Sequence, residues 1–220
     1  PFSKLMLSRY AGVASIPVYE IAYTGSMQIR RLAEAGIRAM MPEISRIGVS
    51  MTEQAWMRIR EIDRRCIRLI VRLALPMYAV LILAAPLLLR IWLGGKFVDS
   101  LPAAFRLALL GSFLSLACVP AYYIFLGLGH VRYCVMNQAI LVVINVLLVL
   151  AFAWTDKRLS LTEAMVSSVI GMAVSSAHTI FRNRRMLHAA AIDVPAGREL
   201  SKENRVVGSK YLYTSSVQDT

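Results

Sequence analysis

Apolar residues fill four long stretches of the chain, and short polar breaks separate them. Each stretch reaches the roughly 20 residues that a helix needs to cross a bilayer. Because the breaks between them are short, neighbouring helices must run antiparallel, and the pattern predicts an up-and-down helical bundle in a membrane. The predicted spans are residues 69–93, 103–126, 133–154 and 161–181.

The N-terminal third is less apolar but also predicts helices. Residues 16–44 contain no proline between Pro17 and Pro42 and are long enough, at about 1.5 Å per residue, to form a fifth span. Residues 1–12 resemble the end of a sixth helix truncated at the chain start. Residues 53–66 predict a charged helix that docks onto the bundle through apolar residues at helical spacing. These residues are Ile59, Ile62 and Cys66.

The predicted fold class is therefore all-α: an integral membrane helical bundle of about five complete transmembrane helices, plus one truncated at the N-terminus. The transmembrane part covers residues 1–188. Hydrophobicity falls and charges mix after this point. We expect residues 189–220 to form a flexible cytoplasmic tail.

Composition and charge agree with a membrane location. Hydrophobic residues make up 57% of the chain and charged residues 17%, with a net charge of +12; soluble domains average roughly 45–50% and 25%. Arginines gather in residues 43–68 and 182–185, which flank the four spans. Cytoplasmic loops are enriched in Lys and Arg, so we expect both segments, and the C-terminus, on the cytoplasmic side. Trp92 and Trp154 then fall at the outer interface.

A polar stripe runs along residues 16–44. On a helical wheel with Glu20 at zero, the stripe spans about 80°. Facing lipid, its charged groups would cost about 2.5–3.5 kcal/mol each at mid-membrane, so we expect them to face protein or water. The stripe consists of Glu20, Thr24, Arg31, Glu34 and Arg38.

Two interpretations of this stripe stay open. Glu34 lies three residues after Arg31 and four before Arg38, spacings at which side chains on a helix can form ion pairs. One carboxylate cannot neutralise both arginines, and the excess positive charge would suit an anionic ligand in a polar cavity. Alternatively, residues 30–38 lie near the cytoplasmic end, with the arginines extending to lipid headgroups. The second interpretation does not explain Glu20, so we favour the cavity.

Smaller polar features predict packing between helices. Gln138 and Asn145 share one face of their span, and either hydrogen bonding between helices or cavity lining would account for them. Ser167, Gly171 and Ser175 repeat every four residues, a spacing that lets helices approach closely.

Several kinds of chemistry are unsupported by the sequence. Cys66, Cys118 and Cys134 form no CxxC pair, and His130 and His178 have no metal-ligand spacing, so no metal site is predicted. There is no glycine-rich phosphate loop and no nucleophile elbow. We therefore expect a protein that is not an enzyme, with no cofactor and no nucleic-acid partner.

Short motifs distributed along the chain carry a family resemblance. They are Lys4–Gly12 (KLMLSRYAG), Tyr19–Ala22 (YEIA), Met41–Ser45 (MPEIS), Ile91–Gly94 (IWLG) and Gly127–Arg132 (GLGHVR). In order and spacing, the chain resembles the oligosaccharide-lipid flippases of polysaccharide biosynthesis. These O-antigen or exopolysaccharide translocases belong to the multidrug/oligosaccharidyl-lipid/polysaccharide exporter superfamily. Pro17 departs from the pattern, since many relatives have glycine there.

The resemblance implies a function. Such flippases have two lobes around a central cavity, and this chain resembles the C-terminal lobe. It would move undecaprenyl-diphosphate-linked oligosaccharide across the bacterial inner membrane by alternating access, with Arg31 and Arg38 meeting the diphosphate. Implied partners are the lipid-linked oligosaccharide, membrane lipids, the N-terminal lobe of the same protein, and the polysaccharide polymerase and chain-length machinery.

Other functions remain open at this stage. Within the same superfamily, the chain could be a lipid II flippase or a cation-coupled multidrug exporter, although a drug exporter should favour acidic cavity residues. From another class, it could be a membrane-embedded polysaccharide polymerase or ligase. That chemistry requires a large outer loop, and the predicted outer loops, residues 94–102 and 155–160, are short.

Overall fold

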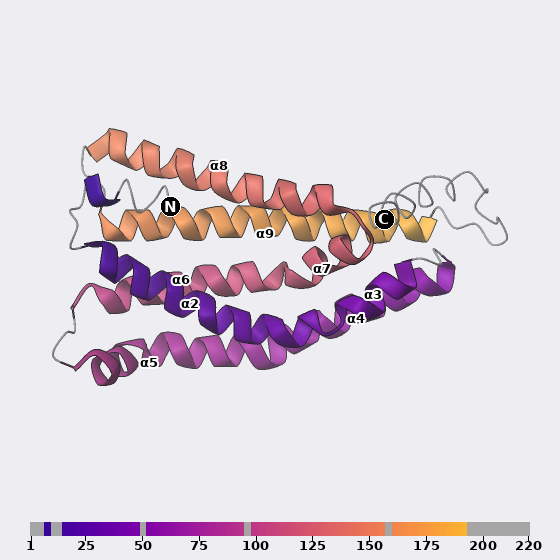
Figure 1. The fold of residues 1–220 in the computed structure, drawn as a ribbon, viewed down its shortest axis with the longest axis horizontal. Coiled ribbons are helices and arrows are strands. Elements are labelled where there is room, and N and C mark those ends of the chain that lie inside the picture. The colour runs from indigo at the N-terminus through magenta and orange to yellow at the C-terminus, as the bar shows by residue number, and fades with distance from the viewer. Residues whose placement is uncertain (1–6, 10–14, 49–51, 95–97, 157–159, 193–220) are drawn as a thin grey trace, which may run out of the picture.

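A computed structural model of the chain describes residues 7–9, 15–48, 52–94, 98–156 and 160–192. Within these ranges all regular secondary structure is helical, as predicted (Figure 1). The elements are α2 (Ser15–Arg38), α3 (Met41–Gly48), α4 (Glu53–Leu69), a π-helical turn η1 (Ile70–Ala74), α5 (Leu75–Leu93), α6 (Leu101–Ala117), α7 (Val119–Gly127), α8 (Val131–Asp156) and α9 (Leu161–Ile192).

The long helices lie side by side as an elongated bundle, with consecutive long helices running in opposite directions (Figure 1). Helix α6 is central: it packs against α2, α5 and α9, while α8 packs mainly on α9. Of the 18 most apolar consecutive residues in each segment, 61% are buried in α6–α7 but only 11% in α8. Helix α8 is therefore peripheral.

Four helical segments among the described residues are long and apolar enough to cross a membrane. They are Gln54–Leu93, Leu101–Gly127, Val131–Trp154 and Leu161–Ala189. Large apolar side chains of α5 and α8 stay exposed on the outside of the bundle, among them Leu83, Leu87, Ile91, Val143 and Leu147. A large exposed apolar surface is stable in contact with lipid chains but unfavourable in contact with water. The chain thus has the character of a membrane protein. Helix α2, which belongs to the predicted fifth span, is not among these four segments.

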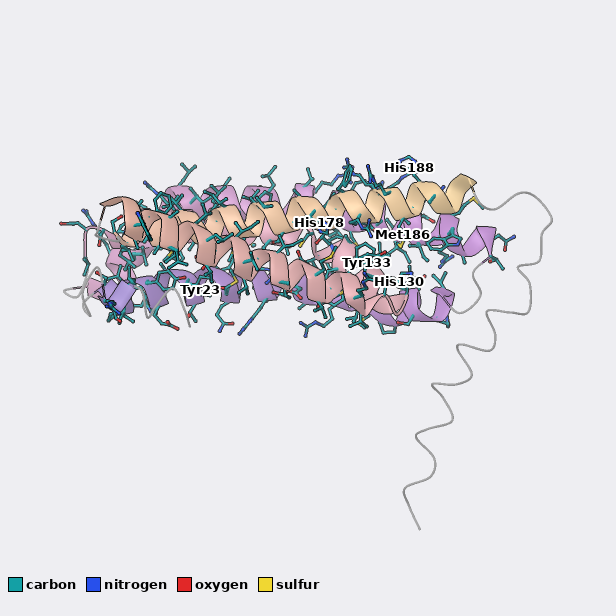
Figure 2. The ribbon with its side chains drawn as sticks, turned by 90° about the horizontal axis from the view of Figure 1, so that it is seen from above. Tyr23, His130, Tyr133, His178, Met186 and His188 are labelled. Atoms are coloured by element: carbon teal, nitrogen blue, oxygen red, sulfur yellow. The ribbon has the colours of Figure 1, made fainter. Side chains whose placement is uncertain are left out.

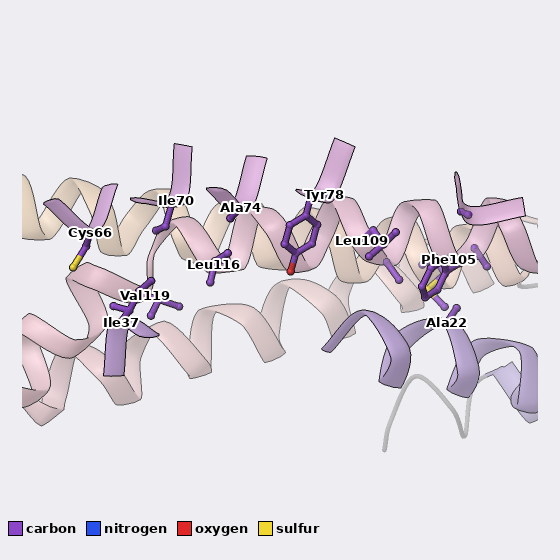
Figure 3. Packing of buried hydrophobic residues seen from close by; sticks show 14 of the residues in the cluster. Ala22, Ile37, Cys66, Ile70, Ala74, Tyr78, Phe105, Leu109, Leu116 and Val119 are labelled. Atoms are coloured by element: carbon purple, nitrogen blue, oxygen red, sulfur yellow. The ribbon is translucent and has the colours of Figure 1, made fainter. Parts of the chain in front are cut away.

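Helices α4, η1 and α5 form one continuous helical segment, so the span predicted from residue 69 begins well inside a longer helix. The predicted docking residues Ile59, Ile62 and Cys66 are all buried, which confirms that face. This buried face continues along η1 and α5 at every fourth residue, through Ile70, Ala74 and Tyr78. Figure 3 shows these side chains facing Leu109 and Leu116 of α6.

Prolines explain where the helices widen or end. Pro76 lacks the N–H that would bond to residue 72, and the turn before it widens, with the Leu75 N–H bonding to the Ile70 carbonyl. Pro42 likewise cannot donate to the Arg38 carbonyl, and α2 ends at Arg38. The predicted single span 16–44 is thus two helices, α2 and α3. Pro120 has a similar effect, and the predicted span 103–126 is divided between α6 and α7.

Helix α9 is longer than the predicted span 161–181, since it continues to Ile192. A reciprocal capping box starts it: the Ser160 N–H bonds to Glu163 Oε2 at 2.6 Å, and the Glu163 N–H bonds to Ser160 Oγ at 3.2 Å. Of the truncated helix predicted at residues 1–12, residues 7–9 are helical. The rest of that prediction, and residues 193–220 of the predicted tail, lie outside the described residues.

Polar side chains join α8 to α9, partly as predicted. Asn145 Nδ2 donates to Ser168 Oγ at 3.0 Å, which confirms hydrogen bonding between helices at this position. Gln138 is exposed, and its neighbour Asn137 is the buried residue, accepting from Thr179 Oγ1 at 2.8 Å. The close approach predicted at Gly171 is also confirmed, since a Cβ there would lie 3.2 Å from the Leu141 carbonyl oxygen.

Gly127 marks a second close contact, between α7 and α3. A Cβ at Gly127 would lie 2.7 Å from Ile44 Cγ2, whereas a Cβ at Gly36 would meet nothing within 4 Å. We expect Gly127→Ala to destabilise the bundle by about 1 kcal/mol or more through overpacking. Gly36→Ala should leave stability unchanged or raise it by up to about 1 kcal/mol, because alanine favours helix. Thermal unfolding in detergent compares the two, and equal changes would contradict the close contact.

Candidate functional site

Helix α2 packs lengthwise on the bundle through one face. Its buried residues are Tyr19, Ala22, Ser26 and Ile37, which lie at about −100° to −160° on the helical wheel that places Glu20 at zero. Tyr19 Oη lies 3.4 Å from Ser168 Oγ of α9, and a Cβ at Gly25 would lie 3.1 Å from the Phe105 ring of α6. At about 36 Å, the helix is long enough to follow the bundle through a bilayer.

The predicted polar stripe lies beside this buried face and not within it. Residues at the far side of the stripe, Thr24 and Arg31, are exposed, as is Arg38, while Glu20 is half-buried. Glu34, at the edge nearest the bundle, has only 12% of its side chain exposed. The described part of the chain therefore covers one edge of the stripe and leaves the rest open.

Glu34 is the centre of a network that connects α2 to α7. Its Oε2 lies 3.2 Å from the Arg30 guanidinium, and its Oε1 lies 3.5 Å from that of Arg38. Tyr123 Oη of α7 donates to Glu34 Oε1 at 2.6 Å and accepts from Arg38 Nε at 2.9 Å. Each oxygen of the carboxylate thus has a partner, and the network fixes α2 against α7.

Arg30 is the residue that the helical wheel missed. Its wheel position, at about −80°, lies outside the predicted stripe but next to the buried face. Arg30 Nε is buried with no hydrogen-bond partner among the described residues. The sequence did contain a signal, because Arg30 and Glu34 are four residues apart, the spacing that favours ion pairs on a helix.

Arg31, in contrast, does not pair with Glu34 as expected. It is exposed and forms no ion pair within the described part of the chain. Arg30 takes its place beside the carboxylate, since the i,i+4 geometry points Arg30 inward while Arg31 lies one step of about 100° further round the helix. Arg31 therefore remains available to a ligand.

Glu20 and Thr24 form a separate pair. Thr24 Oγ1 donates to Glu20 Oε1 at 3.1 Å. Glu20 lies 14 residues, or about 21 Å along the helix, from Glu34. The structure therefore places Glu34 and Arg38 together and leaves Glu20 and Thr24 at the other end of the stripe.

The C-terminal half of α2 has the residues to hold an anion. This part of the helix carries three arginines, Arg30, Arg31 and Arg38, but a single carboxylate, Glu34, which pairs with Arg30 and Arg38. Arg31 and Arg38 are exposed. A guanidinium group bonds phosphate oxygens through two parallel N–H donors. No group of three or more metal-ligating side chains occurs among residues 7–9, 15–48, 52–94, 98–156 and 160–192.

Comparisons with protein-family models, with curated proteins and with solved structures find no match to this chain.

Proposed function

We propose that this chain forms the C-terminal lobe of a flippase for undecaprenyl-diphosphate-linked oligosaccharide, working by alternating access in the bacterial inner membrane. The observation that carries the proposal is the partly open polar stripe on α2, a helix packed lengthwise against the apolar bundle. The short sequence motifs that resemble polysaccharide flippases support the same assignment.

The free-energy cost of placing arginine in hydrocarbon indicates that the polar stripe of α2 does not face lipid. Arg31 and Arg38 are exposed on the described bundle, and each would cost about 2.5–3.5 kcal/mol in contact with hydrocarbon at mid-membrane. A cavity between two lobes removes this cost, because water or a polar substrate then meets the charges. The partner that completes the cavity would be the N-terminal lobe of the same protein.

Arg38 is suited to exchange partners during transport. Its Nε donates to Tyr123 Oη at 2.9 Å, but the contact of its terminal nitrogen with Glu34 is long, at 3.5 Å, and 67% of its side chain is exposed. A diphosphate can therefore bond to Arg38 and Arg31 while Glu34 keeps its bonds to Arg30 and Tyr123. Binding then requires little rearrangement of the network that holds α2 in place.

The test is a double substitution, Arg31→Ala with Arg38→Ala, in the full-length protein of the producing bacterium. We expect surface polysaccharide to be lost while the amount of protein in the membrane stays normal. The matched control is Arg58→Ala with Arg65→Ala, which removes two exposed arginines of α4 that pair with Glu43 and Glu61. Polysaccharide should persist in the control, and unchanged polymer in the α2 variant would overturn the proposal.

A further inference from the structure

A second basic site lies away from α2, where α4 meets the C-terminal part of α9. A cavity of about 170 Å³ opens there, lined by Arg60, Asp63, Arg64, Arg184, Leu187 and His188. Its volume is well above the roughly 10–15 Å³ that a single water molecule needs. Figure 2 shows His188 on α9, toward the same end of the bundle as His130 and Tyr133. The two arginine-rich segments of the sequence meet at this cavity.

Hydrogen bonds between the two helices hold the cavity in shape. Arg60 donates from a terminal guanidinium nitrogen to the Leu187 carbonyl at 2.7 Å. Asn183 Nδ2 donates to Asp63 Oδ1 at 3.3 Å, and both of these residues are buried. The position of the walls is thus determined by contacts that involve neither Arg64 nor Arg184.

Arg64 and Arg184 are exposed and unpaired within the described part of the chain. Both are close enough to Asp63 to interact with it electrostatically, but neither forms an ion pair with it. Their sequence neighbours have partners: Arg65 pairs with Glu61, and the Arg185 guanidinium lies 4.3 Å from the centre of the Phe181 ring. The cavity therefore carries three guanidinium groups against one carboxylate, which leaves two positive charges.

We propose that this cavity binds a phosphate group, carried by an anionic lipid headgroup or by a free phosphate ion. Guanidinium groups are the side chains that best match phosphate oxygens, and two of the three here have no competing partner. Basic pockets on the cytoplasmic side of membrane helices bind lipid phosphates in this way. Asp63 limits the excess charge, so the site suits a single phosphate group better than a polyanion. This inference does not depend on the proposed transport function.

Native mass spectrometry of the purified full chain in detergent tests the proposal. Three probes are added separately: phosphatidylglycerol, a diacylglycerol with the same acyl chains but no phosphate, and inorganic phosphate. The test variant is Arg64→Gln with Arg184→Gln. Its matched control, Arg65→Gln with Arg185→Gln, makes the same change in charge on the same two helices, one residue further along.

We expect the chain to bind phosphatidylglycerol or inorganic phosphate at one site, and to bind diacylglycerol at least about tenfold more weakly. The test variant should lose about tenfold or more in affinity, and the control variant should bind as the original chain does. Displacement of the lipid by inorganic phosphate would identify the phosphate itself as the ligand, whereas binding of the lipid alone would identify a headgroup in the membrane.

Two outcomes would overturn the site. One is an equal loss of affinity in the test and control variants, which would indicate a general effect of surface charge. The other is binding of phosphatidylglycerol no tighter than that of diacylglycerol, with no binding of inorganic phosphate. If the double variant fails to fold, the single variants Arg64→Gln and Arg184→Gln replace it, each with an expected loss of about threefold or more.

Discussion

Replacing Glu34 with leucine is expected to destabilise the bundle by about 3 kcal/mol. The carboxylate has 12% of its side chain exposed and bonds to Arg30, Arg38 and Tyr123. Without it, the guanidinium of Arg30 loses its partner while its Nε, already unpaired, stays buried. Removing one partner of a buried pair costs more than the pair contributes, because the other charge remains.

The matched control for Glu34→Leu is Glu61→Leu. Glu61 also pairs with an arginine four residues away, Arg65, but 54% of its side chain is exposed. An exposed pair of this kind contributes about 0–1 kcal/mol, so the control should be close to neutral. Tyr123→Phe, which removes a single hydroxyl from the network, should lie between the two at about 1 kcal/mol. Chemical unfolding in detergent measures all three, and a control as costly as Glu34→Leu would show that burial plays no part.

This network separates the arginines of α2 into two roles. Arg30 faces the bundle and holds Glu34, so we expect its loss to affect stability. Arg31 is exposed and Arg38 is mostly so, and their loss should affect function more than folding. If the proposed function holds, comparing unfolding with polysaccharide production across variants of these residues distinguishes arginines needed for folding from arginines needed for transport.

Periodicity and length were sufficient to predict the long helices. The apolar stretches correspond to α5, α6–α7, α8 and α9, and the docking residues Ile59, Ile62 and Cys66 lie on the buried face that was expected. Boundaries were harder to predict, because charged residues can continue a helix beyond its apolar part, as in α4 and α9. The end of α2 at Arg38 was not predicted. It is explained by Pro42, which has no N–H to donate to the Arg38 carbonyl four residues earlier.

The candidate site was predicted less completely. A helical wheel of α2 alone finds the strip of polar residues, but it does not show which side of the strip meets the bundle. That side depends on small contacts far apart in sequence, such as Gly25 with Phe105 and Tyr19 with Ser168. Arg30 and Tyr123 were missed for this reason: one lies just outside the strip, and the other comes from α7.

The second large effect concerns the exposed apolar face of α8. Val143 and Leu147, one helical turn apart, are 54% and 60% exposed. In water, charges at such surface positions would change stability by no more than about 0.5 kcal/mol. In lipid, each arginine near the bilayer centre costs about 2.5–3.5 kcal/mol, so Val143→Arg with Leu147→Arg should cost about 5–7 kcal/mol together.

We therefore expect the double variant to insert poorly into membranes. Alkaline extraction of membranes from expressing cells, followed by immunoblotting, measures the inserted fraction. Val131→Arg is the matched control, because Val131 is 51% exposed but begins α8 beside His130 and Arg132, where an arginine can reach the headgroups. Normal insertion of both variants would mean that this face does not meet lipid. Loss in the double variant alone would locate the hydrocarbon layer at the middle of α8.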